Sequence, residues 1–211
     1  SNKHDIPIFL IASRRQIDSS DFGGGYVNNW NTREFANYVQ SKDKKGKTIL
    51  ARDHGGPWQN SMEVDKKFSL AMSMESAKHS FKEDIESGFQ MLHLDPSIDI
   101  HKNLTSDESL ERLFELYSFC NDEAKKNSKV LIFEIGTVEQ SGSTNNPADL
   151  QKTLSKVRRF CLRYNFDFPS FVVIQSGSKV LEMKNVGSFD NELRVKNELP
   201  PEIQIPYMID I

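Results

Sequence analysis

Residues 48–59 read TILARDHGGPWQ and contain the pattern on which the fold assignment depends. A short apolar run is followed by Arg52, Asp53 and His54, and two glycines and a proline then stop the run. The same pattern recurs in QMLHLDPS at 90–97 and in VLIFEIGTVEQSG at 130–142. Each segment predicts a buried strand that carries polar side chains at its C-terminal end.

Five apolar runs lack polar alternation, which is typical of strands buried on both faces of a sheet. They are residues 7–13, 48–52, 91–95, 130–136 and 170–177. Amphipathic segments separate them. Capping-box patterns at Asn31 with Glu34 and at Thr105 with Glu108 predict two helix starts, and residues 62–88 and 148–164 predict further helices. For residues 178–211 the pattern does not decide between loop, strand and helix.

Strand and helix alternate along the chain, which predicts parallel βαβ units and an α/β fold. A doubly wound open sheet and a TIM (β/α)8 barrel both fit this order. No G-x-G-x-x-G opens a helix after the first strand, because GGGY at 23–26 precedes NNWNT. Polar residues at the end of every strand favour the barrel. Five strands are too few to close it, so we expect residues 1–211 to form a single, incomplete barrel domain.

Composition predicts an ordinary globular protein. Of the 211 residues, 37% are hydrophobic and 27% charged, and the net charge of −3 predicts neither nucleic-acid nor membrane binding. No apolar run approaches the roughly 20 residues of a membrane helix, and no signal-peptide pattern opens the chain. Two cysteines, Cys120 and Cys161, cannot form a disulfide framework. We therefore expect a cytoplasmic protein.

Asp53 and His54 are candidates for a proton-transferring carboxylate and a metal-binding imidazole. Adjacent strand residues point to opposite faces, so both can serve one site only where the strand ends and bends. Gly55 and Gly56 allow such a bend. The alternative is a histidine bonded to a nearby carbonyl and an aspartate that caps the next turn.

Two further strands carry ionisable residues. His93 and Asp95 share a strand face, but a lone histidine in an apolar run is more often a hydrogen-bonded core residue than a ligand. The ionised carboxylate of Asp95 is costly to bury without a cation or donors. Glu134, within VLIFEIGT, needs a metal, an arginine or a proton of its own because its apolar neighbours predict a dry surrounding.

Arg14, Arg15 and Gln16 close the first predicted strand. A cationic pair at a strand end can hold a phosphate, and a salt bridge to Asp18 or Asp53 is an equally good account.

Two other polar residues close later strands. Glu139 lies in a Ser/Gly-rich segment that is either a flap over the site or an exposed linker. Gln175 closes the fifth strand. Both are candidate site residues.

Three motifs in register resemble the accessory, Z-type subunits of class II tagatose-bisphosphate aldolase. LIASRRQIDSSDFGGGYVNNWNTREFANYV at 10–39 resembles that family's strand, Gln-x-[Asn/Asp], Gly-Gly-Tyr and helix-starting Thr-x-x-[Asp/Glu]-Phe. ARDHGGPWQ resembles G-G-D-H-x-G-P-x-x-W-Q, and GFQMLHLDPSI resembles G-F-x-K-I-H-L-D-x-S. FEIGTVEQSG is similar to the E-L-G-x-x-G-G-E segment of the catalytic class II aldolases. The agreement covers residues 6–177.

The resemblance implies a TIM barrel acting on ketose bisphosphates or similar sugar phosphates, with zinc polarising the ketone to stabilise an enediolate. It implies that Asp53 transfers a proton, that His54 binds zinc, and that Asp95 and Glu134 lie near the metal. The predicted residues are Asp53 and Glu139 for catalysis, His54 and Glu134 for the metal, and Arg14, Gln16, Gln59, Asp95 and Gln175 for substrate binding.

The chain also departs from the catalytic aldolases. These take two further zinc-binding histidines from later strands, whereas residues 170–177 end in Gln175-Ser176-Gly177 and His101 is the last histidine. The zinc site is therefore expected to be incomplete. The resemblance implies that the first run corresponds to the second barrel strand of the family and that the first and last strands are absent. We expect a fragment of a longer protein, and a barrel closed by a partner is the alternative.

Two functions follow. One is a class II aldolase-like enzyme that performs metal-assisted enediolate chemistry on a sugar phosphate. The other is a non-catalytic partner that stabilises a tagatose-bisphosphate aldolase. The expected associations are a homo-oligomer or a complex with a catalytic aldolase subunit.

Overall fold

The computed structural model describes residues 3–137, 146–181, 183–185, 187, 188, 190, 192, 194 and 200–209. The chain divides into two compact units. One comprises residues 1–137 with 169–171, and the other comprises residues 138–168 with 172–211.

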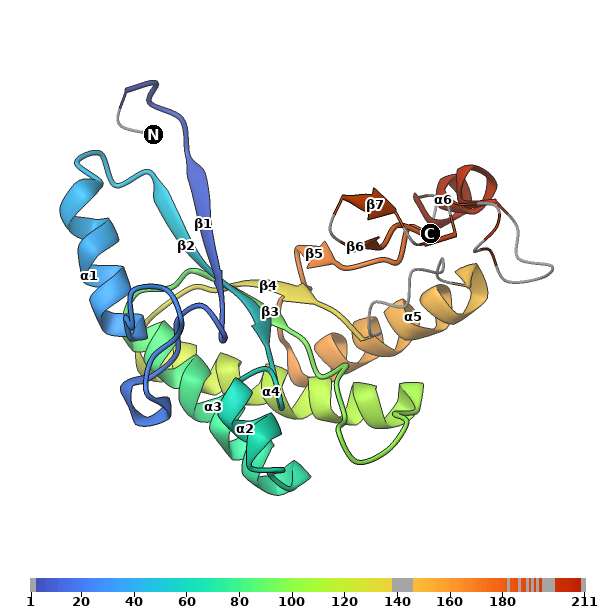
Figure 1. Cartoon of the computed structure of the whole chain (residues 1–211), viewed down its shortest axis with the longest axis horizontal. Helices are drawn as coiled ribbons and strands as arrows, with labels where there is room; N and C mark the ends of the chain where they lie inside the picture. Colours follow the sequence, from blue (N-terminus) through green and yellow to red (C-terminus); the bar gives the residue numbers. More distant parts are fainter. Residues whose placement is uncertain are drawn as a thin grey trace. The chain divides into compact units, whose positions relative to one another are not determined.

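A five-stranded sheet has the strand order β1-β2-β3-β4-β5, with β1 at one edge (Figure 1). The strands are β1 Ile8–Ser13, β2 Thr48–Gly55, β3 Met91–Leu94, β4 Ile132–Ile135 and β5 Phe171–Val172. The pairs β1–β2, β2–β3 and β3–β4 are parallel. The α/β class and the five predicted strands are confirmed.

The helices of the first unit are η1 Ser20–Phe22, α1 Thr32–Lys42, α2 Ser61–Asp65, α3 Leu70–Glu86 and α4 Ser106–Lys126. Helix α3 packs against α1, α4 and β2, and α4 packs against β3 (Figure 1). Both predicted capping boxes are present, at Asn31 and at Thr105. The predicted helical region at 62–88 is interrupted, because Lys67 has a φ of 51° and Ser69 caps a new helix.

The second unit contains α5 Pro147–Tyr164, the strands β6 Val180–Leu181 and β7 Lys184–Asn185, and α6 Pro201–Ile209. Strands β6 and β7 form an antiparallel hairpin. The C-terminal segment that the sequence left open is therefore a hairpin followed by a helix.

Burial differs between the strands. All four residues of β3 are buried, as predicted for a central strand. The prediction of burial on both faces is wrong for β5, where Phe171 is 44% and Val172 37% exposed, and for β1, where Phe9 is 41% and Ile11 58% exposed. The side chains of Phe9 and Ile11 point away from the face on which α1 and α3 pack, and the ring of Phe9 makes an edge-to-face contact with Phe171 of β5, with 6.5 Å between the ring centroids. The helix face is closed, and the opposite face is open at β1.

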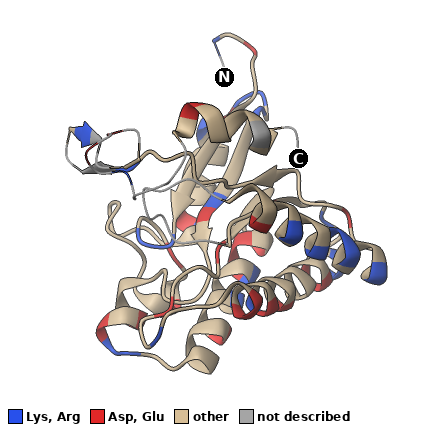
Figure 2. Cartoon of the chain, turned by 90° about the vertical axis from the view of Figure 1, so that its right-hand side faces the viewer, with Lys and Arg blue, Asp and Glu red and all other residues tan. Residues whose placement is uncertain are grey.

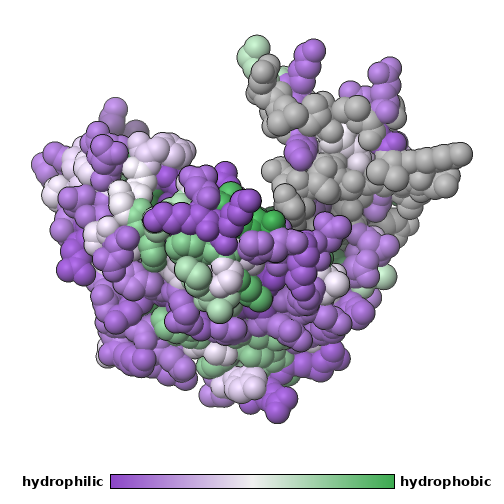
Figure 3. All heavy atoms as spheres, turned by 60° about the horizontal axis from the view of Figure 1, so that its bottom comes forward, coloured by the Kyte–Doolittle hydropathy of each residue, from purple (hydrophilic) through white to green (hydrophobic). Residues whose placement is uncertain are grey.

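On the face seen in Figure 3, hydrophilic residues predominate among the coloured atoms, and hydrophobic residues form smaller patches. Acidic and basic residues are mixed over the helices and also occur on the strands (Figure 2). Among the described helices, none is both long enough and apolar enough to cross a membrane.

A buried ion pair joins the sheet to α3. The guanidinium of Arg52, on β2, donates from Nε and Nη2 to the two carboxylate oxygens of Asp84 at 2.8 and 2.6 Å. Its Nη1 donates to the carbonyls of Ala12 and Ile17 at 3.1 and 2.8 Å. Both charged side chains have no exposed surface. Arg52 therefore ties β1, β2 and α3 together.

Replacing Arg52 by Met should lower the free energy of unfolding by about 3–5 kcal/mol, because Asp84 is left as an uncompensated buried charge. The double variant Arg52→Met/Asp84→Leu should lose less. Lys82→Met, which removes an exposed pair with Glu86 at 3.9 Å, is the control and should change stability by about 0.5 kcal/mol or less. Urea unfolding measures all three. An Arg52→Met variant as stable as the Lys82→Met control would contradict this role.

Candidate functional site

At the end of β2, the consecutive side chains of Asp53 and His54 point to the same side of the sheet. His54 has a φ of 45°, in the left-handed region, and the register between β2 and β3 shifts between Arg52 and Gly55. This irregularity removes the strict alternation that would send Asp53 and His54 to opposite faces. The bend anticipated from the sequence is present.

The two glycines after His54 are required by close packing. A Cβ at Gly55 would lie 2.4 Å from the ring of Phe81, and a Cβ at Gly56 would lie 2.0 Å from the carbonyl oxygen of Asp95. The amide of Asp95 also donates to the carbonyl of Gly55 at 2.7 Å. The turn after β2 is therefore held directly against the end of β3.

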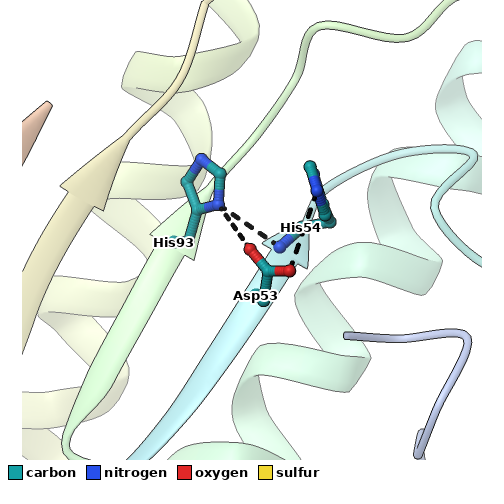
Figure 4. A group of neighbouring side chains, drawn as sticks. All are labelled: Asp53, His54 and His93. Atoms are coloured by element: carbon teal, nitrogen blue, oxygen red, sulfur yellow. Dashed lines mark hydrogen bonds and ion pairs between the residues drawn. The ribbon is translucent and has the colours of Figure 1, made fainter. Parts of the chain in front are cut away.

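Asp53, His54 and His93 form a cluster at the C-terminal ends of β2 and β3 (Figure 4). Nδ1 of His93 lies 3.2 Å from Oδ1 of Asp53, and Nε2 of His54 lies 3.7 Å from Oδ2 of the same carboxylate. One donor atom from each residue lies within 4.8 Å of the other two. Three metal-ligating side chains from two strands thus meet at one point.

A second layer holds the cluster. Nδ1 of His54 is bonded to Oδ2 of Asp95 at 2.6 Å, and Nε2 of Gln59 donates to the same oxygen at 2.8 Å. The amide of Ser97 donates to Oδ1 of Asp95 at 3.2 Å. Asp95 is 4% exposed and Gln59 is 4% exposed. The carboxylate of Asp95 therefore fixes the orientation of the His54 ring through its Nδ1 atom.

These contacts shift three pKa values. The hydrogen bond to Asp95 raises the pKa of His54, and the charge of Asp53 adds to the rise. Burial acts to raise the pKa of Asp95, but its hydrogen bond to His54 and the nearby imidazole of His93 lower it further than burial raises it. Burial likewise opposes, without overcoming, the lowering of the pKa of Asp53 by His93 and His54. Both carboxylates are ionised at neutral pH.

The cluster fits a divalent metal ion. Two imidazoles and a carboxylate are ligands that zinc accepts, and three protein ligands are typical of a catalytic zinc site. His54 offers Nε2 while Asp95 holds its Nδ1, which is how carboxylates commonly orient metal-binding histidines. His93 is 4% exposed, and its Nε2 has no hydrogen-bond partner among the described residues. The nitrogen of His93 that faces Asp53 is Nδ1, so this unsatisfied atom lies on the far side of the ring and the fit to a metal rests on the ligand types alone.

The other predicted residues lie in different surroundings. Glu134 is the register partner of His93 on β4, but it is not part of the three-residue cluster. Gln16 is half-buried, and its Oε1 accepts from the amide of Ser13 at 2.9 Å. Gln175 is buried in the second unit. Glu139 lies outside the described residues.

Arg14 is buried in an ion-pair network. Its Nε contacts Oδ2 of Asp18 at 3.0 Å, and its Nη1 lies 2.7 Å from Oε1 of Glu63. The same Nη1 donates to the carbonyl of Gly56 at 2.8 Å. Of the two accounts that the sequence left open, the salt bridge to Asp18 is the one present in the structure.

His93 is the cluster residue that sequence reasoning ranked as a core histidine. Its neighbours in sequence are apolar, and nothing local distinguishes it from a structural residue. The pattern that could have identified it is the register of β2 and β3. Alignment of Arg52 with Leu92 places Asp53 opposite His93.

No family model and no curated protein matches the chain. Among solved structures, the chain is similar to a "probable tagatose 6 phosphate kinase" from Sinorhizobium meliloti 1021, with a TM-score of 0.69 and 19% identity. The match covers 88% of this chain and 46% of that protein, so this chain spans about half its length. This likeness shows the fold alone.

A second match is to a protein from Burkholderia cenocepacia J2315 described as a phosphonomutase. It has 14% identity and covers 79% of this chain and 68% of that one. Its TM-score is 0.36, which does not indicate a shared fold.

Asp95→Asn should lower the pKa of His54, because the charged partner that stabilises the imidazolium is removed. The His54 ring of the wild-type protein should stay protonated to a higher pH than the ring of the variant. NMR titration of the metal-free proteins measures this difference, and His79, an exposed residue of α3, is the internal reference. Equal titration of His54 in both proteins would show that Asp95 does not control this ring.

Proposed function

We propose that the chain performs metal-assisted enediolate chemistry on a ketose phosphate or bisphosphate, as class II aldolases do. The observation that supports this most is the convergence of Asp53, His54 and His93 at the C-terminal ends of neighbouring parallel strands. Reactive groups of parallel α/β enzymes gather at this edge of the sheet. The three motifs that resemble the tagatose-bisphosphate aldolase subunits include these three residues.

His54 and His93 would hold the metal ion, which we propose to be zinc, and Asp53 would complete the ligand set or accept a proton from the substrate. A divalent cation in this place would supply polarisation of a substrate carbonyl. Asp95 would keep the ring of His54 oriented with Nε2 toward the metal, and Gln59 would hold Asp95. We therefore propose that Gln59 and Asp95 position the metal-binding residues, and not that they contact the substrate directly.

We further propose that the sheet is part of an incomplete TIM barrel. Phe9 and Ile11 are exposed on the face of β1 opposite the helices, and this is the face that lines the interior of a barrel. Additional strands, from further chain or from a partner, would cover these side chains. The partial coverage of the S. meliloti structure agrees with this proposal.

The substrate class is proposed on the resemblance. The S. meliloti protein with the same fold is itself named for a tagatose phosphate. Gln16 and Gln175 remain proposed substrate contacts, and Glu139 remains a proposed second catalytic residue. Glu134, which neighbours His93 across β3 and β4, remains a proposed carboxylate near the metal.

The second candidate function is a non-catalytic partner of a tagatose-bisphosphate aldolase. The motifs at 10–39, 51–59 and 88–98 resemble accessory subunits more closely than catalytic ones, and this favours the alternative. A partner of this kind would raise the activity or stability of a catalytic subunit without cleaving substrate by itself.

Metal analysis tests the proposal. The protein should contain stoichiometric zinc after dialysis, and His54→Ala and His93→Ala should each lose most of it because each removes a ligand. His79→Ala removes an exposed histidine outside the cluster and should keep the wild-type content. Mass spectrometry of the bound metal is the measurement. If the wild type and both cluster variants contained the same amount of zinc per chain, Asp53, His54 and His93 would not be the metal site.

A cleavage assay separates the two functions. An enzyme should release triose phosphates from tagatose 1,6-bisphosphate, and His54→Ala should lower kcat by at least about a hundredfold. A non-catalytic partner should release none alone, and it should increase the rate of an added catalytic aldolase subunit.

A further inference from the structure

A cavity of about 420 Å³ lies in the same unit of the chain as the candidate site. Its walls are the segment after β1, residues 14–29, and the segment after β2, residues 60–66. Its volume falls within the range of small-molecule sites, about 300–1,000 Å³. The metal cluster does not line it, so its chemistry is separate from that of Asp53, His54 and His93.

The cavity carries more positive than negative unpaired charge. Arg14, Arg15 and Lys66 line it together with one carboxylate, Asp65. Arg14 is neutralised by its buried contacts with Asp18 and Glu63. Arg15 and Lys66 are exposed, and neither side chain has an ion pair or hydrogen bond within the described part of the chain. Two cations are thus available to a ligand, and the neutral polar residues Asn29 and Ser61 also line the cavity, one in each wall.

The wall formed by residues 23–26 is already folded. A Cβ at Gly25 would lie 2.1 Å from the carbonyl oxygen of Gln16, so the segment approaches the end of β1 as closely as a backbone can. The amides of Gly25 and Tyr26 donate to the carbonyls of Trp30 and Arg15 at 3.2 and 3.1 Å. The last bond anchors the main chain of Arg15. A cavity with a preformed wall loses little conformational entropy when a ligand binds.

Two consecutive residues connect the cavity to the metal cluster. The side chain of Gln59 donates to Asp95, which holds His54, while the next residue, Asn60, lines the cavity and donates to the buried Asp18 at 2.8 Å. The two places are therefore built on the same short segment after β2.

We propose that this cavity is a subsite for a phosphate monoester and that Arg15 and Lys66 supply the positive charge that binds it. The assignment rests on the proposed function, because it gives the phosphate end of the sugar phosphate a place in the same unit as the metal cluster. A phosphate dianion carries strong acceptor oxygens that match a guanidinium, an ammonium and neutral donors. The volume exceeds what a phosphate alone occupies and leaves room for part of the sugar chain.

Binding of inorganic phosphate to the intact chain tests this subsite. In ¹⁵N-NMR titrations, phosphate should shift the amide signals of Gly23, Gly24 and Gly25. Arg15→Gln and Lys66→Gln should each weaken binding by on the order of tenfold, because each removes one of two cations. Arg33→Gln removes an exposed cation on α1 that does not line the cavity, and it should bind phosphate as the wild type does.

Metal content distinguishes failure of this subsite from failure of the proposed function. Arg15→Gln should retain wild-type zinc, since Arg15 is not a member of the cluster. Wild-type phosphate affinity in both Arg15→Gln and Lys66→Gln, or unshifted glycine amides, would overturn the subsite even if zinc is bound. Phosphate binding that follows the expected pattern in a protein without zinc would support the subsite and would count against the metal chemistry.

Discussion

The backbone of His54 lies in the left-handed region, and the candidate site depends on it. Such a conformation costs a residue other than glycine roughly 1–3 kcal/mol and persists only where its surroundings fix it. Here the carbonyl of Gly55 accepts from the amide of Asp95 at 2.7 Å, and Nδ1 of His54 is bonded to Oδ2 of Asp95 at 2.6 Å. The same bonds that hold the turn also bring β2 and β3 together. An extended backbone at His54 would turn its ring away from Asp53 and leave Asp95 without its imidazole partner.

A buried ion pair between Glu63 and Arg14 stabilises the segments that carry the site. Glu63 contacts Arg14 and Ser76 through Oε1 and accepts from the amide of Trp58 through Oε2 at 2.5 Å. Burial raises the pKa of Glu63, and the nearby guanidinium of Arg14 opposes the rise. The network fixes the segment between β2 and α2, in which Gln59 follows Trp58 directly. Through it, ionic contacts remote from the cluster set the position of a residue that holds Asp95.

The sequence contained enough information for the strands and for part of the site. Apolar runs identified all five strands of the larger sheet but not β6 and β7. Asp53, His54 and Asp95 could be selected because ionisable residues at strand ends are costly unless they have partners. His93 could not be selected in the same way, because its role depends on strand register, which no local pattern reports. The sequence also contained no sign that Arg14 would be buried in ion pairs while Arg15 would be exposed. Arg14 is paired with Glu63, nearly fifty residues away, and only the fold brings these two residues together.

Side chains alternate between the two faces of β2, so that the structural residue Arg52 and the candidate site residue Asp53 lie on opposite faces. Arg52 points to the helices and is paired with Asp84, whereas the next residue, Asp53, points to the opposite face and contacts His93. Ser13 pairs with Asp53 in the sheet, and His93 pairs with Glu134, so one row of polar residues crosses four strands on the face opposite the helices. A charge on the helix face must be neutralised by a fixed protein partner because no ligand can reach it. Charges on the opposite face have no such requirement, and this is why the donors suited to a metal ion are concentrated there.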